Sequence, residues 1–151
     1  MVMDQIDREI IGLLQHDGRI TATDLAKQIQ LSLSATSERL RQLKESGVIS
    51  GFSVFVDPAA VGRPIEALID VRLSAGARQD ILDDAIAKYP VIVDAIHLTG
   101  RFDTQLRVAT KDVAELDQLL VQLKEELEAE ETNTRLVLRT IKGFPRPAAL
   151  S

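Results

Sequence analysis

The 151-residue chain contains no cysteine and no tryptophan, and only 3% of its residues are aromatic. Without cysteine it can form no disulfide, no thiolate nucleophile and no cysteine-ligated zinc site. The scarcity of aromatic side chains argues against a protein that stacks single-stranded nucleic acid on exposed rings. Imidazole chemistry is restricted to His16 and His97, which lie far apart in the sequence. An enzyme built from this set of residues would be unusual.

Long apolar runs and leader sequences are missing as well. No segment approaches the roughly 18 consecutive apolar residues that a membrane span requires. The N-terminal MVMDQIDREI has acids where a signal peptide has lysines. No glycine-rich phosphate loop, nucleophile elbow or metal motif occurs either. We therefore expect a cytoplasmic protein with no membrane partner, no catalytic residue, no metal and no cofactor.

The chain also lacks an excess of positive charge. It has 18 Lys and Arg against 23 Asp and Glu, a net charge of −5. Bulk electrostatics would repel nucleic acid, so any contact with DNA must come from a local patch. The proportions of hydrophobic (45%) and charged (27%) residues are those of a globular protein. The length indicates one domain or two small ones.

The first third of the chain has the pattern of three short helices. Apolar residues at positions 6, 10, 13 and 14 mark a one-sided first helix, and Thr21 precedes a second. The third helix runs to about residue 46, with Ser32 or Ser34 as its N-cap and Gly47 as its left-handed terminator. The last two helices, joined by a tight turn, predict a helix-turn-helix.

From residue 51 the pattern becomes that of strands. In the segment GFSVFVD, Phe52, Val54 and Val56 alternate with Ser53 and Phe55, and a linker follows. Strands are then expected at 67–73, 91–99, 104–110 and 133–141, and helices at 81–89 and 113–127. This β-α-β-β-α-β order is ferredoxin-like. The apolar stripe of the last helix covers only about two heptads, which favours packing on a sheet over a coiled coil. The acidic run at 125–131 is interpreted as the solvated end of that helix.

The predicted fold is therefore α+β with two domains. A winged helix-turn-helix domain occupies residues 1–50, and a hinge strand with a linker occupies 51–64. A ferredoxin-like domain follows at 65–143, with a polar tail at 144–151.

The predicted third helix has the strongest chemical signal in the chain. With Leu40 and Leu43 turned inward, small residues lie at its N-terminal end and polar side chains follow. Such a surface can enter a major groove and reach base edges, with cations on the phosphates of either wall. The simpler alternative is a solvated charged face, but the lengths of the preceding helix and turn favour DNA reading. The candidate DNA-binding residues are Ser34, Ala35, Thr36, Ser37, Arg39, Arg41, Gln42 and Lys44.

The local charge of this region is modest. Residues 1–60 hold six Lys or Arg and eight Asp or Glu, a net charge of −2, whereas residues 33–46 have a net charge of +1. One copy would bind DNA weakly at physiological salt, and several copies on one duplex would accumulate phosphate contacts. We therefore expect a homo-oligomer.

Four motifs occur in the order found in a known family. IDREIIGLLQHDGR, DLAKQIQLS, ERLRQLKESGVISGF and a later GRFD loop resemble the Lrp/AsnC (leucine-responsive, feast/famine) family of prokaryotic transcriptional regulators, over residues 4 to about 143. Two residues of this chain depart from the usual pattern of the family. Gln30 stands where the family usually has a turn glycine, and Leu33 stands where a proline often starts the recognition helix. Gln30 would need a left-handed or compensated turn conformation.

The resemblance implies an assembly and an effector site. Residues 51–57 would form a strand that pairs with the same segment of a second subunit. The ferredoxin-like half would be a RAM domain that dimerises through its sheet, and four dimers commonly form an octamer. An effector, usually an amino acid, sits between dimers near the loop after the second strand of that domain. Carried over by motif, the effector-binding residues are Thr99, Gly100, Arg101, Phe102 and Asp103, with Thr132 and Thr134 on the last strand opposite.

The chemistry of that loop can be argued from its residues. Backbone N–H groups near Gly100 can approach a carboxylate, and Asp103 can accept from an ammonium group. The alternative is a hairpin turn, in which glycine and aspartate are favoured in any case. Arg101 could bind an effector carboxylate or point to solvent.

We therefore expect a cytoplasmic, nucleoid-associated, sequence-specific transcription regulator. Its expected partners are double-stranded DNA, an amino-acid effector and copies of itself. The main alternative is a ligand-independent protein of the same fold that organises DNA. A third possibility is a small enzyme of the acylphosphatase type, which would need a phosphate-binding loop with an arginine and an asparagine. The only asparagine, Asn133, lies on a predicted strand and not in a loop, which argues against such an enzyme.

Overall fold

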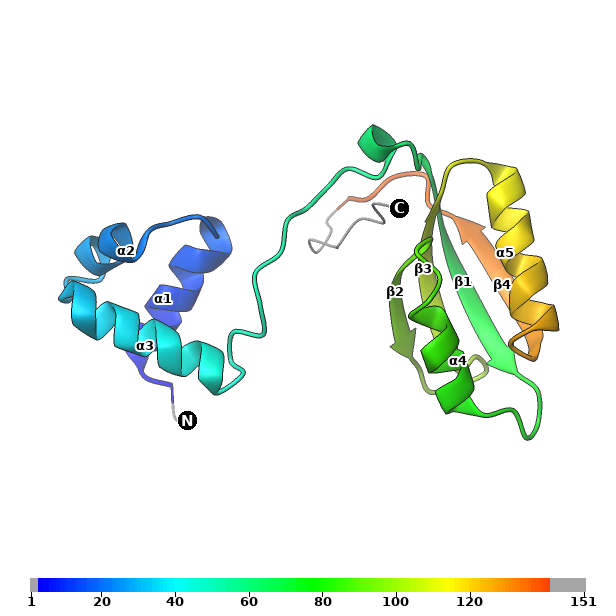
Figure 1. Cartoon of the computed structure of the whole chain (residues 1–151), viewed down its shortest axis with the longest axis horizontal. Coiled ribbons are helices and arrows are strands. Elements are labelled where there is room, and N and C mark those ends of the chain that lie inside the picture. The colour runs from blue at the N-terminus through cyan, green and yellow to red at the C-terminus, as the bar shows by residue number, and fades with distance from the viewer. Residues whose placement is uncertain (1–2, 142–151) are drawn as a thin grey trace. The chain divides into compact units, whose positions relative to one another are not determined.

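A computed structural model describes residues 3–141, which divide into two compact units between Phe52 and Ser53 (Figure 1). None of the helices in this range is long and apolar enough to cross a bilayer. The N-terminal unit consists of α1 (Gln5–His16), α2 (Ala22–Gln28) and α3 (Leu33–Glu45). The C-terminal unit consists of the 3-10 turn η1 (Ala59–Val61), β1 (Ile65–Leu73), α4 (Gln79–Ile86), β2 (Ile92–His97), β3 (Thr104–Thr110), α5 (Val113–Glu125) and β4 (Ala129–Leu136).

Side-chain caps fix where the three N-terminal helices begin. Asp4 and Asp7 form a reciprocal capping box at the start of α1, each carboxylate accepting from the other residue's backbone N–H. Thr21 caps α2, and Ser32 caps α3. Gly47 has φ 77° after the end of α3, a conformation that glycine adopts without strain. The caps expected before the second and third helices and the terminator expected at Gly47 are confirmed.

The N-terminal core is small and shared by all three helices. Its buried side chains are Ile10, Leu25, Ile29 and Leu43. Helices of 7 to 13 residues are marginal alone, so their stability depends on this packing. Gln30 lies in the turn between α2 and α3 with φ 55°, so of the two expected conformations, left-handed or compensated, it adopts the left-handed one.

The C-terminal unit is a four-stranded antiparallel sheet in the order β2-β3-β1-β4. Helices α4 and α5 lie on one face of it (Figure 1). The predicted ferredoxin-like β-α-β-β-α-β arrangement is confirmed. The buried core between sheet and helices includes Ala67, Ile69, Val71, Leu82, Leu106, Val108, Leu116, Leu119 and Leu123.

The other face of the sheet is polar. Asp70 on β1 is buried, and it accepts hydrogen bonds from Gln105 at 2.7 Å, Asn133 at 3.3 Å and Arg135 at 2.7 Å. Its donors come from the two strands on either side of β1. The central carboxylate on this face is therefore satisfied within the sheet.

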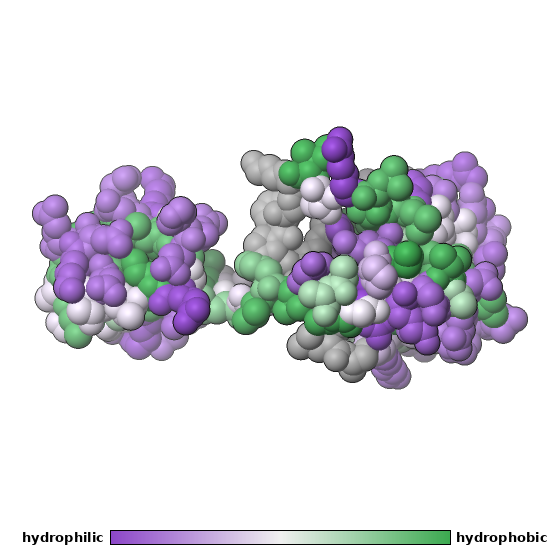
Figure 2. Space-filling model, turned by 90° about the horizontal axis from the view of Figure 1, so that it is seen from above, coloured by the Kyte–Doolittle hydropathy of each residue, from purple (hydrophilic) through white to green (hydrophobic). Residues whose placement is uncertain are grey.

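The predicted hinge strand is absent from the single chain. Residues 51–56 have no strand pairing, and Phe52, Val54 and Phe55 are 52%, 76% and 57% exposed. Figure 2 shows hydrophobic atoms on the surface of the segment that joins the two units. A strand needs a partner backbone for its hydrogen bonds, and no segment within residues 3–141 pairs with this one.

The last strand lies earlier than predicted. Helix α5 ends at Glu125, and Glu128 takes φ 54°, so the chain reverses there. Part of the acidic run, Glu130 and Glu131, consequently lies on β4 rather than at the end of a helix. The tail predicted at 144–151 lies outside the described residues.

Candidate nucleic-acid interface and effector loop

The outward side of α3 carries most of the predicted DNA-binding residues. Small side chains lie in its first turn and longer polar ones follow toward its C-terminal end. This order allows close approach to a groove at one end of the helix and reach to base edges and phosphates further along. The exposed members are Ser34, Ser37, Arg41, Gln42 and Lys44, and Ala35 is half-buried.

Thr36 is wrongly predicted as a DNA contact. Its side chain is 0% exposed, and its hydroxyl donates to the backbone oxygen of Ser32 at 3.0 Å. A buried side chain cannot reach DNA. The spacing of Thr36, Leu40 and Leu43, at i, i+4 and i+7, places Thr36 on the inward stripe, and this signal was available in the sequence.

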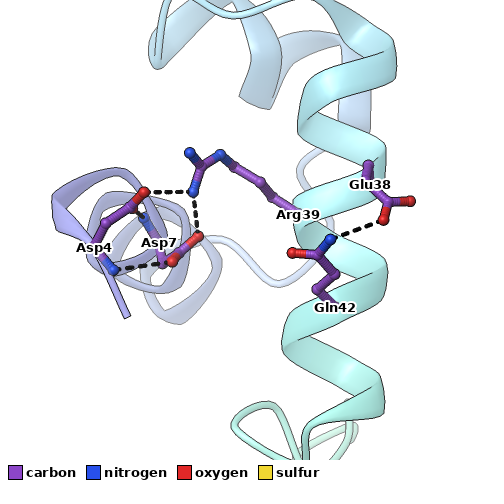
Figure 3. Close-up of polar contacts among 5 residues, drawn as sticks. All are labelled: Asp4, Asp7, Glu38, Arg39 and Gln42. Carbon is purple, nitrogen blue, oxygen red and sulfur yellow. Dashed lines mark hydrogen bonds and ion pairs between the residues drawn. The ribbon is translucent and has the colours of Figure 1, made fainter. Parts of the chain in front are cut away.

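Arg39 is engaged inside the domain. One of its terminal nitrogens donates to Asp4 and to Asp7, each at 2.8 Å (Figure 3). Asp7 is only 4% exposed, so its carboxylate depends on this cation. Arg39 therefore fastens α3 to the start of α1, instead of projecting as a phosphate contact. The residues are more than 30 positions apart, and no local pattern connects them.

Electrostatics keep this contact charged at neutral pH. The pKa of Asp4 is lowered, first by the backbone N–H of Asp7 and then by the Arg39 guanidinium. The same two carboxylates raise the pKa of Arg39. Both shifts favour the charged forms of Asp4 and Arg39 in this contact.

Glu38 holds the two polar side chains predicted to read bases. Arg41 donates to Glu38 from Nε at 2.9 Å and from a terminal nitrogen at 2.6 Å. Gln42 donates to the same carboxylate at 2.8 Å (Figure 3). Arg41 is also paired with Glu45 at 2.5 Å. The hydrogen bonds from Arg41, and secondly from Gln42, lower the pKa of Glu38 to about 2.

The GRFD loop joins β2 to β3 and is fastened to β1. Gly100 has φ 115°, which other residues rarely adopt. The backbone N–H of Asp103 donates to Val71, and its carboxylate accepts from the backbone N–H of Leu73 at 2.8 Å. Asp103 thus has a structural role in this turn, whatever it binds.

The other predicted effector residues occupy different surroundings. Thr99 is exposed and Phe102 is half-buried. Arg101 donates to Glu131 at 2.5 Å. Thr132 and Thr134 pair with the buried Val71 and Ile69 and so share the helix-covered face, whereas Glu131 pairs with Arg72 on the opposite face. Within one chain, the structure does not bring the two threonines to the side chain of Arg101.

A cavity of about 220 Å³ opens beside this loop in the C-terminal unit. His97 contacts Thr104 at 3.1 Å through Nδ1 and Asp83 at 3.0 Å through Nε2. Sequence reasoning missed this cavity, because its walls come from α4 and two strands. Among residues 3–141, no group of three or more His, Asp or Glu could hold a metal ion. The cavity is lined by Asp83, Ile86, Ala95, Ile96, His97 and Thr104.

Comparisons with known families match both units. A winged helix-turn-helix DNA-binding family matches residues 3–50, and the Lrp/AsnC ligand-binding domain family matches residues 66–147. The HTH-type transcriptional regulator FL11 of Pyrococcus horikoshii is 37% identical over 140 residues, covering 93% of this chain and 92% of FL11. The regulator AldR of Mycolicibacterium smegmatis is 35% identical over 144 residues, covering 93% and 84% of the two chains.

Solved structures agree with this result. A transcriptional regulator from Neisseria meningitidis, solved in complex with L-Met, superposes with a TM-score of 0.87 at 25% identity, covering 94% of each chain. LrpC of Bacillus subtilis superposes with a TM-score of 0.86 at 25% identity, covering 94% of this chain and 99% of LrpC. FL11, AldR and the Neisseria protein are regulators of transcription. The chain therefore belongs to the Lrp/AsnC family of DNA-binding transcriptional regulators that carry a ligand-binding domain.

Proposed function

We propose that this regulator reads specific DNA sequences with α3 and that an amino acid controls its assembly or its DNA binding. One observation carries the proposal: a helix-turn-helix with an exposed polar recognition face is joined to a ligand-binding domain. The L-Met complex of the related Neisseria regulator supports an amino acid as the class of effector. Because its target is genomic DNA, the protein works at the nucleoid in the cytoplasm.

The DNA contacts are divided among the residues of α3. Ser34, Ala35 and Ser37 allow close approach to the groove. Arg41 and Gln42 reach base edges, and Lys44 meets a phosphate. Arg39 acts as a positioning residue through its contacts with α1.

A second copy of the chain covers the hinge. Residues 51–56 are extended and unpaired, and their large apolar side chains are exposed. Pairing of two such segments would satisfy both backbones and bury Val54 and Phe55 in part. Dimers then bring two copies of α3 to one duplex and add phosphate contacts. Further assembly, up to the octamer common in the family, follows from the resemblance.

The effector binds at the GRFD loop. Backbone N–H groups around Gly100 face the effector carboxylate, and Asp103 accepts from its ammonium group. Thr99, Arg101 and Phe102 complete the loop side of the site, and Thr132 and Thr134 approach it from a neighbouring subunit. The effector changes DNA occupancy only as far as it binds one assembly better than another.

Light scattering after size exclusion, run with each of the twenty amino acids, tests this function. DNA-binding titrations against a duplex selected from a random pool accompany it. An amino acid that changes the mass or the apparent dissociation constant identifies the effector. If none changes either, the protein is the ligand-independent DNA organiser instead.

Replacing Asp103 by asparagine separates its two roles. The amide oxygen of Asn can still accept from the N–H of Leu73, but the negative charge for the ammonium group is gone. We expect D103N to fold normally and to bind the effector about tenfold to a hundredfold more weakly. Calorimetric titration measures this, with Asp84→Asn on α4 as the exposed control. Unchanged effector affinity in D103N would place the ammonium site elsewhere.

A further inference from the structure

Every cation on α3 is engaged inside its own domain. Arg39 binds two carboxylates of α1. Arg41 binds Glu38 and Glu45. The ammonium group of Lys44 lies 5.2 Å from the ring centroid of Phe52. The net charge of +1 in segment 33–46 therefore does not describe what DNA would meet, because these charges already have partners.

The guanidinium of Arg41 is occupied on both edges. Its Nε and one terminal nitrogen bind the two oxygens of Glu38 at 2.9 and 2.6 Å, and the other terminal nitrogen binds Glu45 at 2.5 Å. The side chains of Arg41 and Glu38 are 53% and 49% exposed. An ion pair exposed to this degree is weak in water, so an incoming duplex can displace it.

The consequence for Glu38 depends on which part of DNA displaces it from Arg41. When a phosphate binds Arg41, Glu38 loses its cation and lies close to another negative charge. The DNA backbone offers no hydrogen-bond donor that could replace it. Donors for a carboxylate exist in the major groove only on base edges, at cytosine N4 and adenine N6. Sequence-independent binding through phosphates therefore leaves Glu38 with only Gln42 and water as partners beside another negative charge, whereas docking on suitable bases supplies a new donor.

A G·C pair can satisfy the whole cluster. The O6 and N7 atoms of guanine present two acceptors to Arg41, in place of the two carboxylate oxygens of Glu38. The amino group of cytosine can then donate to Glu38. Gln42, which shares the same carboxylate, becomes free to bind a neighbouring base.

We infer that Glu38 is a specificity-determining residue of this regulator. It weakens binding to DNA of arbitrary sequence, and it favours sites that place a cytosine amino group opposite its carboxylate. The inference rests on the proposed reading of DNA by α3, and it adds the selectivity of that reading.

The test compares E38Q with E45Q in the full-length protein. Both variants remove one negative charge and one partner of Arg41, but only Glu38 also binds Gln42. A consensus is first selected for the wild type from random duplexes. Anisotropy titrations then measure affinity for the selected duplex and for a scrambled one, at salt concentrations from about 50 to 200 mM. Thermal melts confirm that both variants fold.

We expect E38Q to bind the scrambled duplex about tenfold more tightly than the wild type, with no gain on the selected duplex. The specificity ratio then falls about tenfold, and a fresh selection with E38Q shows a weaker preference at one G·C position, because a neutral amide oxygen accepts from the cytosine amino group less strongly than a carboxylate does. E45Q should tighten binding to both duplexes equally. If E38Q also tightens both equally, Glu38 acts as a simple charge and the inference is wrong.

Different results would contradict the proposed function itself. If the wild type selects no consensus, or if Arg41→Ala binds the selected duplex as tightly as the wild type, α3 does not read the sequence. That result would overturn both the DNA-reading proposal and the role of Glu38. A wild-type consensus with an unchanged ratio in E38Q would overturn only the latter.

Discussion

For Arg39, a single contact in the folded protein changes the role expected from the sequence. In sequence it is one of several cations on a helix suited to DNA, yet its guanidinium lies against two carboxylates of α1. Asp7 is nearly fully buried, and a buried charge without a partner is costly. Arg39 therefore contributes to the orientation of the recognition helix more directly than to contact with DNA.

Replacing Arg39 by alanine should destabilise the N-terminal unit. The buried carboxylate of Asp7 would keep its backbone contact to Asp4 but lose its cation, and we expect the melting temperature to fall by about 5 °C. Calorimetry of the full chain measures this. Arg8→Ala on the exposed side of α1 is the matched control and should change little. Equal melting temperatures for the two variants would show that the Arg39 contact adds no stability.

Glu38 provides a second prediction at this scale. Hydrogen bonds from Arg41, and then from Gln42, lower its pKa from 4.5 to about 2. A lowered pKa means that the charged group favours the folded state. Its contribution is complete above pH 4.5 and is lost as the pH falls toward 2. Carboxyl-carbon NMR should find Glu38 titrating below 4.5, and Arg41→Ala should return its pKa most of the way to 4.5. A wild-type midpoint near 4.5 would show that the Glu38–Arg41 contact is not formed in solution.

At the scale of elements, the helix-turn-helix depends on a strained turn. Gln30 has a positive φ of 55° between α2 and α3, where a residue with a Cβ is less stable than glycine. The turn persists because Ile29 before it is buried in the shared core. Packing of the two helices thus maintains a local conformation that the residue itself disfavours.

Gln30→Gly should therefore stabilise the N-terminal unit by about 0.5–1 kcal/mol, since relief of strain exceeds the added freedom of the unfolded chain. Gln28→Gly, at the last position of α2, is the control and should destabilise it by up to about 1 kcal/mol. Urea unfolding followed by circular dichroism compares them. A loss of stability in Gln30→Gly would mean that the side chain makes contacts worth more than the strain.

The alternation of apolar residues predicts the position of one strand correctly and that of another wrongly. Alternation predicts β3 at 104–110, and the structure has it at Thr104–Thr110. The last strand was predicted from the apolar residues within 133–141, but β1 pairs with the more polar 129–136. The backbone N–H of Ser74 donates to the backbone oxygen of Glu128, which supports this register. The hydropathy of the sequence gives no sign of this contact.

At the scale of the whole molecule, the hinge is the feature that a single chain leaves incomplete. Val54 and Phe55 are exposed, and the backbone around them lacks strand pairing. Val54→Pro would remove one N–H donor and block a ladder. We expect the variant to dimerise about tenfold more weakly, with a parallel loss of DNA affinity.

Light scattering across a dilution series measures this change, with Ser53→Ala as the control. Ser53 lies next to Val54 in the same unpaired segment, and its replacement keeps the backbone donor. An identical mass distribution for V54P and the wild type at every dilution would show that the hinge takes no part in assembly.

The sequence by itself determined most of the elements, though not the position of β4, and it determined the family. Helix caps and the alternation of β3 are local signals, since each depends on residues within a few positions of one another, and each of the four motifs is a short stretch of sequence. They were sufficient for the two-domain fold and for membership of the Lrp/AsnC family.

Only the tertiary structure decided which candidate residues are available for binding. It engages Arg39 with Asp4 and Asp7, and it uses the carboxylate of Asp103 to anchor a turn. These contacts join residues about 30 positions or more apart in the sequence. The free energy of such contacts arises from groups that only folding brings together, so no local pattern in the sequence records them.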